Sequence, residues 1–360
     1  MSNPSKGAIV YLTDQRDFHK MSLSLQRLDT YYNNRWKAPV VIFHPAKSVG
    51  STAGDPLTIE QQHTLRKATR SSLTFAEVDF SVPSLTAPSE APLLIFGKSL
   101  GYRQMCAFFA FHYAHHPALK RYDYVWRFDS DAFLLRDVRE DLFEAMERGN
   151  WTYGWRGLIC EPDCVVVGLE NTVKGHLGVS TLCGRLEDKF TSGSCKSDAT
   201  LGHYTGTKGW SGTMYYNNFE VVHLPWLRSR EYSSLAASVD AAGGIWMHRW
   251  GDAPIRTLAV QLLLPRESVH QFTEVAYEHQ GEFNVYAQPD DCLSCTMEVG
   301  AWAAEDRCGL ERSIKAWTLV ACVLCWAAVL GGWLWKRGLN GKAAAALKGP
   351  SHSSTKLGTL

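Results

Sequence analysis

The stretch YVWRFDSDAF, Tyr124–Phe133, determines how the rest of this sequence is interpreted. A run of apolar and aromatic residues, typical of a buried strand, passes directly into the acidic pair Asp129 and Asp131. Two carboxylates two positions apart, where a strand turns outward, can face the same divalent cation. Such a cation neutralises the charge that builds on a leaving phosphate. The alternative is a helix cap or a solvated turn, which also uses Asp.

Strands and helices alternate through the residues before this stretch. Apolar, β-branched runs at Ala8–Leu12 and Pro39–Phe43 predict buried strands, and apolar residues at helical spacing predict helices at His19–Tyr32 and Tyr102–His115. This alternation predicts an α/β fold with a mixed, mostly parallel central sheet and helices on both faces. Ligands of such folds bind outside the carboxyl ends of the strands, which is where the acidic pair is expected.

The second half of the sequence predicts a long loop followed by helices. The residues of Ser192–Gly212 are rich in Gly, Ser, Thr and Lys and predict a loop, and loops of this length are often functional. Helical patterns follow at Glu231–Ala242 and Ala253–Leu264.

Charge and composition restrict the classes of partner. Of 360 residues, 37 are Lys or Arg and 36 are Asp or Glu, for a net charge of +1, so the overall field does not favour nucleic acid. Five of the basic residues lie within 336–360, which has no acidic residue, and the preceding part is therefore mildly acidic. The 13 Trp and 14 Tyr suit sugar binding as well as a core.

The end of the sequence predicts a membrane anchor. Residues 316–335 form an uncharged run of 20 residues, which as a helix spans about 30 Å, the thickness of the hydrocarbon core. We therefore expect a catalytic domain at 1–288, a Cys-containing stalk at 289–315, one transmembrane helix at 316–335 and a short basic tail at 336–360.

The positive charge of the tail at 336–360 predicts the orientation of the protein in the membrane. The positive-inside rule places the tail in the cytosol and the body in the lumen of the ER or Golgi, as a single-pass protein. No signal peptide is predicted at the start of the sequence as written, which conflicts with that orientation. Either further residues precede this start, or the protein is a tail-anchored outlier.

Two other features favour an oxidising lumen. Outside the apolar run there are eight cysteines, an even number that includes the close pairs Cys160/Cys164 and Cys292/Cys295 and suggests disulfides. A zinc site is the alternative, but Cys292, Cys295 and Cys308 have no convincing fourth ligand nearby in the sequence. The triplet Asn150-Trp151-Thr152 is an N-glycosylation sequon.

Four blocks of sequence resemble glycosyltransferase family 15, the fungal-type α-1,2-mannosyltransferases. These blocks are SLGYRQMCAFFAF (Ser99–Phe111), YDYVWRFDSDAFLLRDV (Tyr122–Val138), YYNNFEVVHLPWLRSREY (Tyr215–Tyr232) and GGIWMHRWGDAPIRTLAVQLLL (Gly243–Leu264). The resemblance runs from about residue 6 to residue 285. It implies a GT-A-like nucleotide-diphospho-sugar transferase fold, GDP-mannose as donor, manganese as cofactor, a glycan or glycoprotein as acceptor, and retention of anomeric configuration.

The resemblance also implies roles for individual residues. Tyr102 and Arg103 match a Tyr-Arg pair at the donor site, where a ring and a guanidinium suit stacking and diphosphate binding. Glu220 matches a carboxylate proposed as the nucleophile or the stabiliser of the transition state. Asn217 and Asn218 precede it and are expected to bond sugar hydroxyls. The alternative for Glu220 is a salt bridge at the surface.

This sequence departs from the family pattern at two positions. Asp129 replaces the Glu of a Glu-Pro pair, and Arg256 replaces a His that is expected to bind manganese. Because Arg stays protonated, Arg256 cannot bind a metal, although it could hold the diphosphate. His248 and His270 are substitute ligand candidates.

Asp252 is the remaining residue of the site. It lies in the intact WGDAP block, either as part of the start of the following helix or as a donor or acceptor contact.

Three functions therefore remain open at this point. The first is a membrane-anchored, retaining α-1,2-mannosyltransferase of protein glycosylation. The second is the same fold with another nucleotide sugar. The third is a non-catalytic, membrane-tethered sugar-binding protein.

Overall fold

The structure, a computed structural model, describes residues 6–47, 54–161, 165–192, 195–198, 203–206 and 209–280. The expected stalk at 289–315, membrane helix at 316–335 and basic tail at 336–360 lie outside these residues, as does the end of the expected catalytic domain. None of the described helices has the length and apolar character needed to cross a bilayer.

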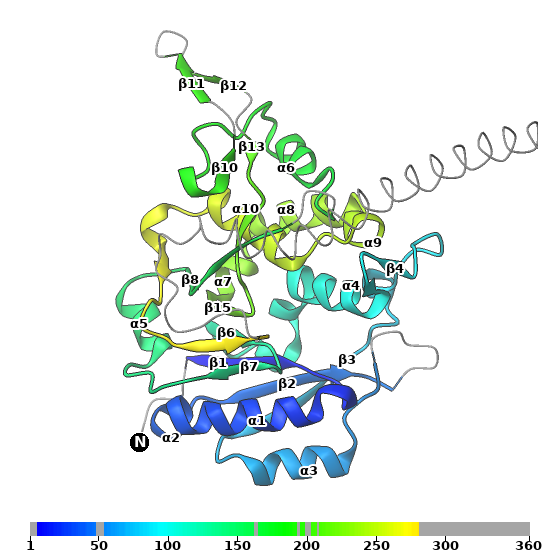
Figure 1. The fold of residues 1–360 in the computed structure, drawn as a ribbon, viewed down its shortest axis with the longest axis vertical. Helices are drawn as coiled ribbons and strands as arrows, with labels where there is room; N and C mark the ends of the chain where they lie inside the picture. Colours follow the sequence, from blue (N-terminus) through cyan, green and yellow to red (C-terminus); the bar gives the residue numbers. More distant parts are fainter. Residues whose placement is uncertain are drawn as a thin grey trace, which may run out of the picture. The chain divides into compact units, whose positions relative to one another are not determined.

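A seven-stranded sheet forms the centre of the described residues (Figure 1). Its strands, in spatial order, are β16 (Val269–Gln271), β8 (Tyr153–Trp155), β15 (Phe219–His223), β6 (Tyr124–Phe128), β1 (Gly7–Leu12), β2 (Val40–Pro45) and β3 (Leu73–Val78). Within this sheet β15 is antiparallel to both of its neighbours, and the other pairs of adjacent strands are parallel. The expectation of a mixed, mostly parallel sheet is confirmed.

Helices cover both faces of this sheet, which explains why its central strands are apolar throughout. Alternate residues of β1 point to opposite faces: Ile9 and Tyr11 enter one core, and Ala8 and Val10 enter the other. Figure 1 shows α1 and α3 on one side of the sheet and α4, α8 and α10 on the other. The helices are α1 (Phe18–Leu28), α2 (Asn34–Trp36), α3 (Ile59–Ala68), α4 (Leu100–Ala107), α5 (Leu142–Arg148), α6 (Leu169–Leu177), α7 (Leu224–Leu227), α8 (Arg230–Ala241), α9 (Gly244–His248) and α10 (Asp252–Leu263).

Two of the predicted helices are interrupted. The helix expected at His19–Tyr32 ends as α-helix at Leu28 and continues through one π-helical turn, and the helix expected at Tyr102–His115 does the same after Ala107. The other expected strands and helices lie within two residues of their predicted places.

The predicted loop at Ser192–Gly212 is partly wrong. Short antiparallel pairs form there, β10 (Thr191–Ser192) with β13 (Gly209–Trp210) and β11 (Cys195–Asp198) with β12 (His203–Gly206). Backbone hydrogen bonds make such ladders, so they leave no alternation of apolar side chains for a sequence pattern to reveal. Three more antiparallel pairs are β4 (Leu94–Ile95) with β5 (Lys98–Ser99), β9 (Leu158–Cys160) with β14 (Thr213–Tyr215), and β7 (Ala132–Leu134) with β17 (Tyr277–His279).

The order of the strands identifies a topological switch point, the place in the sheet where successive strands are added on opposite sides of β1. From β1 the chain adds β2 and β3 on one side and then returns to place β6 on the other side of β1. Ligands of α/β sheets bind outside the carboxyl ends of the strands at such a point. Asp14 follows β1 there, and Asp129 follows β6.

Candidate active site

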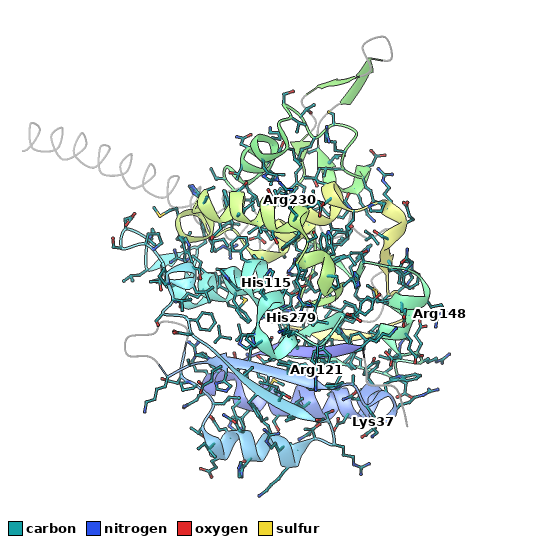
Figure 2. All side chains as sticks on the ribbon, turned by 180° about the vertical axis from the view of Figure 1, so that it is seen from behind. Lys37, His115, Arg121, Arg148, Arg230 and His279 are labelled. Carbon is teal, nitrogen blue, oxygen red and sulfur yellow. The ribbon has the colours of Figure 1, made fainter. Side chains whose placement is uncertain are left out.

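Asp129, Asp131 and His279 lie together beside this switch point. Both aspartates belong to the turn between β6 and β7, and β17 pairs with β7 so that His279 lies opposite Ala132. His279 Nε2 is 3.1 Å from Asp131 Oδ1 and 3.6 Å from Asp129 Oδ2. The three potential ligand atoms lie within 4.8 Å of one another. Figure 2 labels His279 close to the central sheet.

These residues fit a divalent cation. Two carboxylates and an imidazole are a suitable ligand set for manganese. His279 Nε2 faces the two carboxylates, while the ring's Nδ1 lies 2.6 Å from the hydroxyl of Tyr216. The side chains of Asp129 and Asp131 are 29% and 19% exposed, so an ion can reach their oxygens from solvent.

Electrostatics keeps Asp131 ionised. Burial by itself would raise the pKa of this carboxyl group, but His279, Gln280 and Lys20 outweigh burial and hold the pKa well below its usual value. Gln280 Nε2 donates a hydrogen bond of 3.2 Å to Asp131, and Lys20 Nζ lies 3.6 Å away. The ligand is therefore charged and ready for a cation at neutral pH.

Arg127 connects Asp129 to Asp252. Its guanidinium is buried, pairs with the Asp252 carboxylate, lies 3.3 Å from Asp129 Oδ1 and stacks 3.7 Å from the ring centroid of Phe109. Burial alone would lower the pKa of Arg127, but the surrounding carboxylates, above all that of Asp252, raise it. The side chain therefore remains a fixed positive charge behind the cation site.

Asp252 lies within the protein at the first position of α10. Its carboxylate accepts hydrogen bonds from Arg127 and, at 2.8 Å, from Asn217 Nδ2. Negative charge is also favourable at a helix N-terminus. Both Asp252 and Asn217 are buried and bonded to each other, and their expected contact with the substrate stays a prediction.

Asn218 connects the turn before β15 to β17. Its Oδ1 accepts a 2.9 Å hydrogen bond from Tyr277, and its buried Nδ2 has no hydrogen-bond partner among the described residues. The asparagine pair therefore links the start of β15 to α10 through Asn217 and to β17 through Asn218.

Glu220 and Arg256 form a fully buried ion pair. Arg256 Nε lies 3.2 Å from Glu220 Oε2, and the hydroxyl of Tyr113 donates to Oε1 at the same distance. Arg256 also donates to Tyr232 and, at 2.9 Å, to the carbonyl oxygen of Phe109. Both charged side chains are at most 1% exposed, and the expected roles of Glu220 toward the sugar and of Arg256 toward a diphosphate stay predictions.

Arg103 also differs from the expected placement. It is fully buried, and its guanidinium donates to the backbone carbonyls of Pro92 and Trp246. It therefore ties the segment before β4 to α9, and its expected contact with a diphosphate stays a prediction. Tyr102 is half-buried, with Lys98 and Arg249 over its ring at 5.1 and 5.8 Å.

The two substitute histidines lie elsewhere. His270 is in β16, where its ring stacks on Trp151 with centroids 3.5 Å apart, and His248 ends α9. The histidine that lies beside the two aspartates is instead His279, a candidate metal ligand that the sequence pattern did not indicate, and neither Tyr216 nor Arg127 was indicated by it. Asp14 was also missed: it follows β1 and accepts hydrogen bonds from the backbone and side chain of Arg16.

One cysteine prediction can be followed in the described residues. Cys183 is disulfide-bonded, and the buried Cys106 is free. The expected pair Cys292/Cys295 lies outside the described residues.

Comparison with known proteins relates this chain to fungal mannosyltransferases. Residues 3–326 match the family described as glycolipid 2-alpha-mannosyltransferase. The O-glycoside alpha-1,2-mannosyltransferase homolog 5 of Schizosaccharomyces pombe is 25% identical, over 90% of this chain and 78% of its own length.

Solved structures share the fold. Core-mannan synthase A from Aspergillus fumigatus, in its Mn/GDP form, aligns with a TM-score of 0.65 at 22% identity over 80% of this chain and 78% of its own. The mannosyltransferase Ktr4p from S. cerevisiae in complex with GDP aligns with a TM-score of 0.63 at 20% identity, over 81% of each chain.

Proposed function

The chain belongs to the glycolipid 2-alpha-mannosyltransferase family, and on this premise we propose that it transfers mannose from GDP-mannose to a hydroxyl group of a mannose or glycan acceptor. It is a mannosyltransferase, and so a glycosyltransferase. The observation that carries the proposal is the grouping of Asp129, Asp131 and His279 at the switch point of the sheet.

These three residues would hold a divalent cation, for which manganese is the candidate. When bound, the cation supplies positive charge for the diphosphate of the donor and of the leaving GDP. Lys20 adds a mobile positive charge at the same edge, since its Nζ lies near Asp131. Arg127 keeps Asp129 in place from behind and does not reach the solvent.

The buried pair Glu220–Arg256 has a supporting role in this proposal. Glu220 has no exposed surface and is bonded to Tyr113 and Arg256 on the sheet, so it does not serve as the nucleophile in the arrangement described. The pair instead joins β15 to α10, the helix that carries Asp252.

The acceptor linkage and the location are further parts of the proposal. The names of the relatives support an α-1,2 linkage and a role in protein glycosylation. The apolar run 316–335 and the sequon at Asn150 support a single-pass protein with its body in the lumen of the Golgi or ER. Cys183, which is disulfide-bonded, is consistent with that compartment.

The direct test uses the purified full chain with GDP-mannose and methyl α-mannoside, with and without manganese. We expect metal-dependent transfer, reduced at least 100-fold by Asp131→Asn because the cation loses a charged ligand. Asp79→Asn, a change at an exposed carboxylate outside the site, is the matched control and should leave transfer unchanged.

Other outcomes separate the alternatives. Transfer from a UDP-sugar but not from GDP-mannose would replace the donor. Absence of both transfer and hydrolysis with every nucleotide sugar would contradict the enzyme itself and favour a sugar-binding protein.

A further inference from the structure

Tyr216 contacts the histidine of the cation site on the side away from the carboxylates. Its hydroxyl oxygen lies 2.6 Å from His279 Nδ1, while Nε2 of the same ring faces Asp131. We propose that Tyr216 is a positioning residue for His279, fixing which ring nitrogen is free to bind the cation. This inference rests on the proposed function, because it assigns a second layer to the same cation site.

The chemistry of imidazole determines which atom donates in the hydrogen bond between His279 and Tyr216. A neutral imidazole that binds a cation through Nε2 carries its proton on Nδ1. That N–H then donates to the hydroxyl oxygen of Tyr216, and the hydroxyl is left to donate its own proton elsewhere. A phenylalanine at the same place has no acceptor, and the buried N–H of His279 would be unsatisfied, which disfavours this tautomer.

The ring of His279 needs such a partner. The outer torsion of a histidine side chain is broad, so backbone position alone does not fix the ring's rotation. His279 is also the last residue of β17, a strand of only three residues, and Gln280 after it has a left-handed backbone with φ of 53°. The ring is therefore held at the end of a short strand, where side-chain contacts decide its orientation.

Tyr216 is itself well anchored. Its backbone N–H donates to Gly157 at 2.9 Å, and its carbonyl accepts from Phe219 at 3.3 Å. The two aromatic rings of Tyr216 and His279 meet edge to face, with centroids 5.4 Å apart. A fixed tyrosine can therefore transmit the position of the β14–β15 turn to the cation ligand.

If the hydroxyl of Tyr216 had a purely structural role, a different experimental result would be expected. If it only satisfied a buried ring, its loss would lower the stability of the metal-free chain and leave the affinity for the cation unchanged. A positioning role lowers the affinity, because second-layer partners of metal ligands contribute about 10- to 100-fold.

The experiment titrates Mn²⁺ alone into the full chain by isothermal calorimetry, comparing wild type with Tyr216→Phe. We expect Tyr216→Phe to weaken Mn²⁺ binding by about 10- to 100-fold. Thermal melting of each metal-free chain shows that the variant is folded. Tyr32→Phe is the matched control: it also loses a hydrogen bond, a 3.1 Å bond to Asp141 outside the site, and should bind Mn²⁺ like wild type.

A double variant establishes that Tyr216 acts through His279. In a His279→Ala background, Tyr216→Phe should cause no further loss of affinity, because the ligand it positions is gone. Equal Mn²⁺ affinity of Tyr216→Phe and wild type would overturn the inference and leave the proposed function standing. Absence of Mn²⁺ binding by the wild type would instead overturn the cation site on which both rest.

Discussion

At the scale of single residues, the unusual feature is a pair of charges with no contact to solvent. Glu220 and Arg256 lie on adjacent elements, β15 and α10, and each satisfies the other inside the core. Removing one partner of a buried pair leaves the other charge uncompensated, which costs about 3–5 kcal/mol. The sequence block around Glu220 predicts a role in the chemistry, which stays a prediction, and in this structure the residue is one half of a buried ion pair.

Glu220→Gln tests this assignment. The amide keeps the shape and can still accept a hydrogen bond, but it removes the negative charge opposite Arg256, so we expect the free energy of unfolding to fall by about 3 kcal/mol. Urea unfolding measures the loss. Transferase activity is then compared per folded molecule and should be close to that of wild type.

Asp79→Asn is again the control, since an exposed carboxylate should change stability by less than about 0.5 kcal/mol. A Glu220→Gln protein that is fully folded yet inactive would show that the carboxylate takes part in the reaction.

At the scale of elements, the sequence predicts a strand well when the strand is long and its residues form an apolar pattern. β1, β2 and β6 are buried, largely apolar strands of five or six residues, and each is indicated by its run of apolar residues. β17 has three residues, Tyr277, Glu278 and His279, and no pattern distinguishes it from a loop. Its pairing with β7 depends on contacts between residues far apart in the chain.

The same limit explains which site residues were found. Asp129 and Asp131 are adjacent to a strong strand, so their place at its carboxyl end followed from local sequence. His279 reaches them only through the pairing of β17 with β7. Arg103 and Arg256 were expected to bind the donor diphosphate, on the resemblance to the family, and only the packed structure shows the carbonyl and carboxylate groups that pair with them inside the protein.

The packing of β8 gives a test at this scale. A Cβ atom added at Gly154 would collide with the ring of Phe272, which lies directly over the strand. Overpacking of this kind costs about 1–3 kcal/mol, so Gly154→Ala should lower the midpoint of urea unfolding.

Combining this change with Phe272→Leu should recover part of the loss, because the smaller side chain makes room for the methyl group. Strictly additive losses in the double variant would argue against a contact between these two residues.

At the scale of the whole molecule, histidines make the stability depend on pH. Burial lowers the pKa of His112, His116, His223 and His270 below the ordinary value of 6.5. The unfolded chain then binds more protons than the folded chain just below pH 6.5, so stability is full above that pH and is lost as the pH falls. Asp240, whose pKa burial raises, opposes this trend at lower pH.

We therefore expect a lower free energy of unfolding at pH 5.5 than at pH 7.5, measured by urea titration at constant ionic strength. His270→Asn should reduce the difference between the two pH values. Equal stability at both pH values would contradict the assignment of these histidines.

The proposed membrane topology, with the body of the protein in the lumen, can be tested by N-glycosylation. Asn150 is exposed between α5 and β8, with a left-handed backbone of φ 50°, so an oligosaccharide can be attached without unfolding. If the body enters the lumen, protein expressed in a eukaryotic host should lose mass on treatment with a glycosidase specific for N-linked glycans. Asn150→Gln should remove this shift, and an unchanged mobility of the wild type would argue for a cytosolic body.

The pairing of β17 with β7 has a consequence for synthesis. The aspartates of the cation site emerge from the ribosome about 150 residues before the histidine that completes it. A nascent or prematurely terminated polypeptide that lacks β17 can form most of the sheet, yet it has only two of the three ligands. On the proposed cation site, we expect a chain that ends before His279 to bind Mn²⁺ more weakly than the full chain, because one of the three ligands is missing.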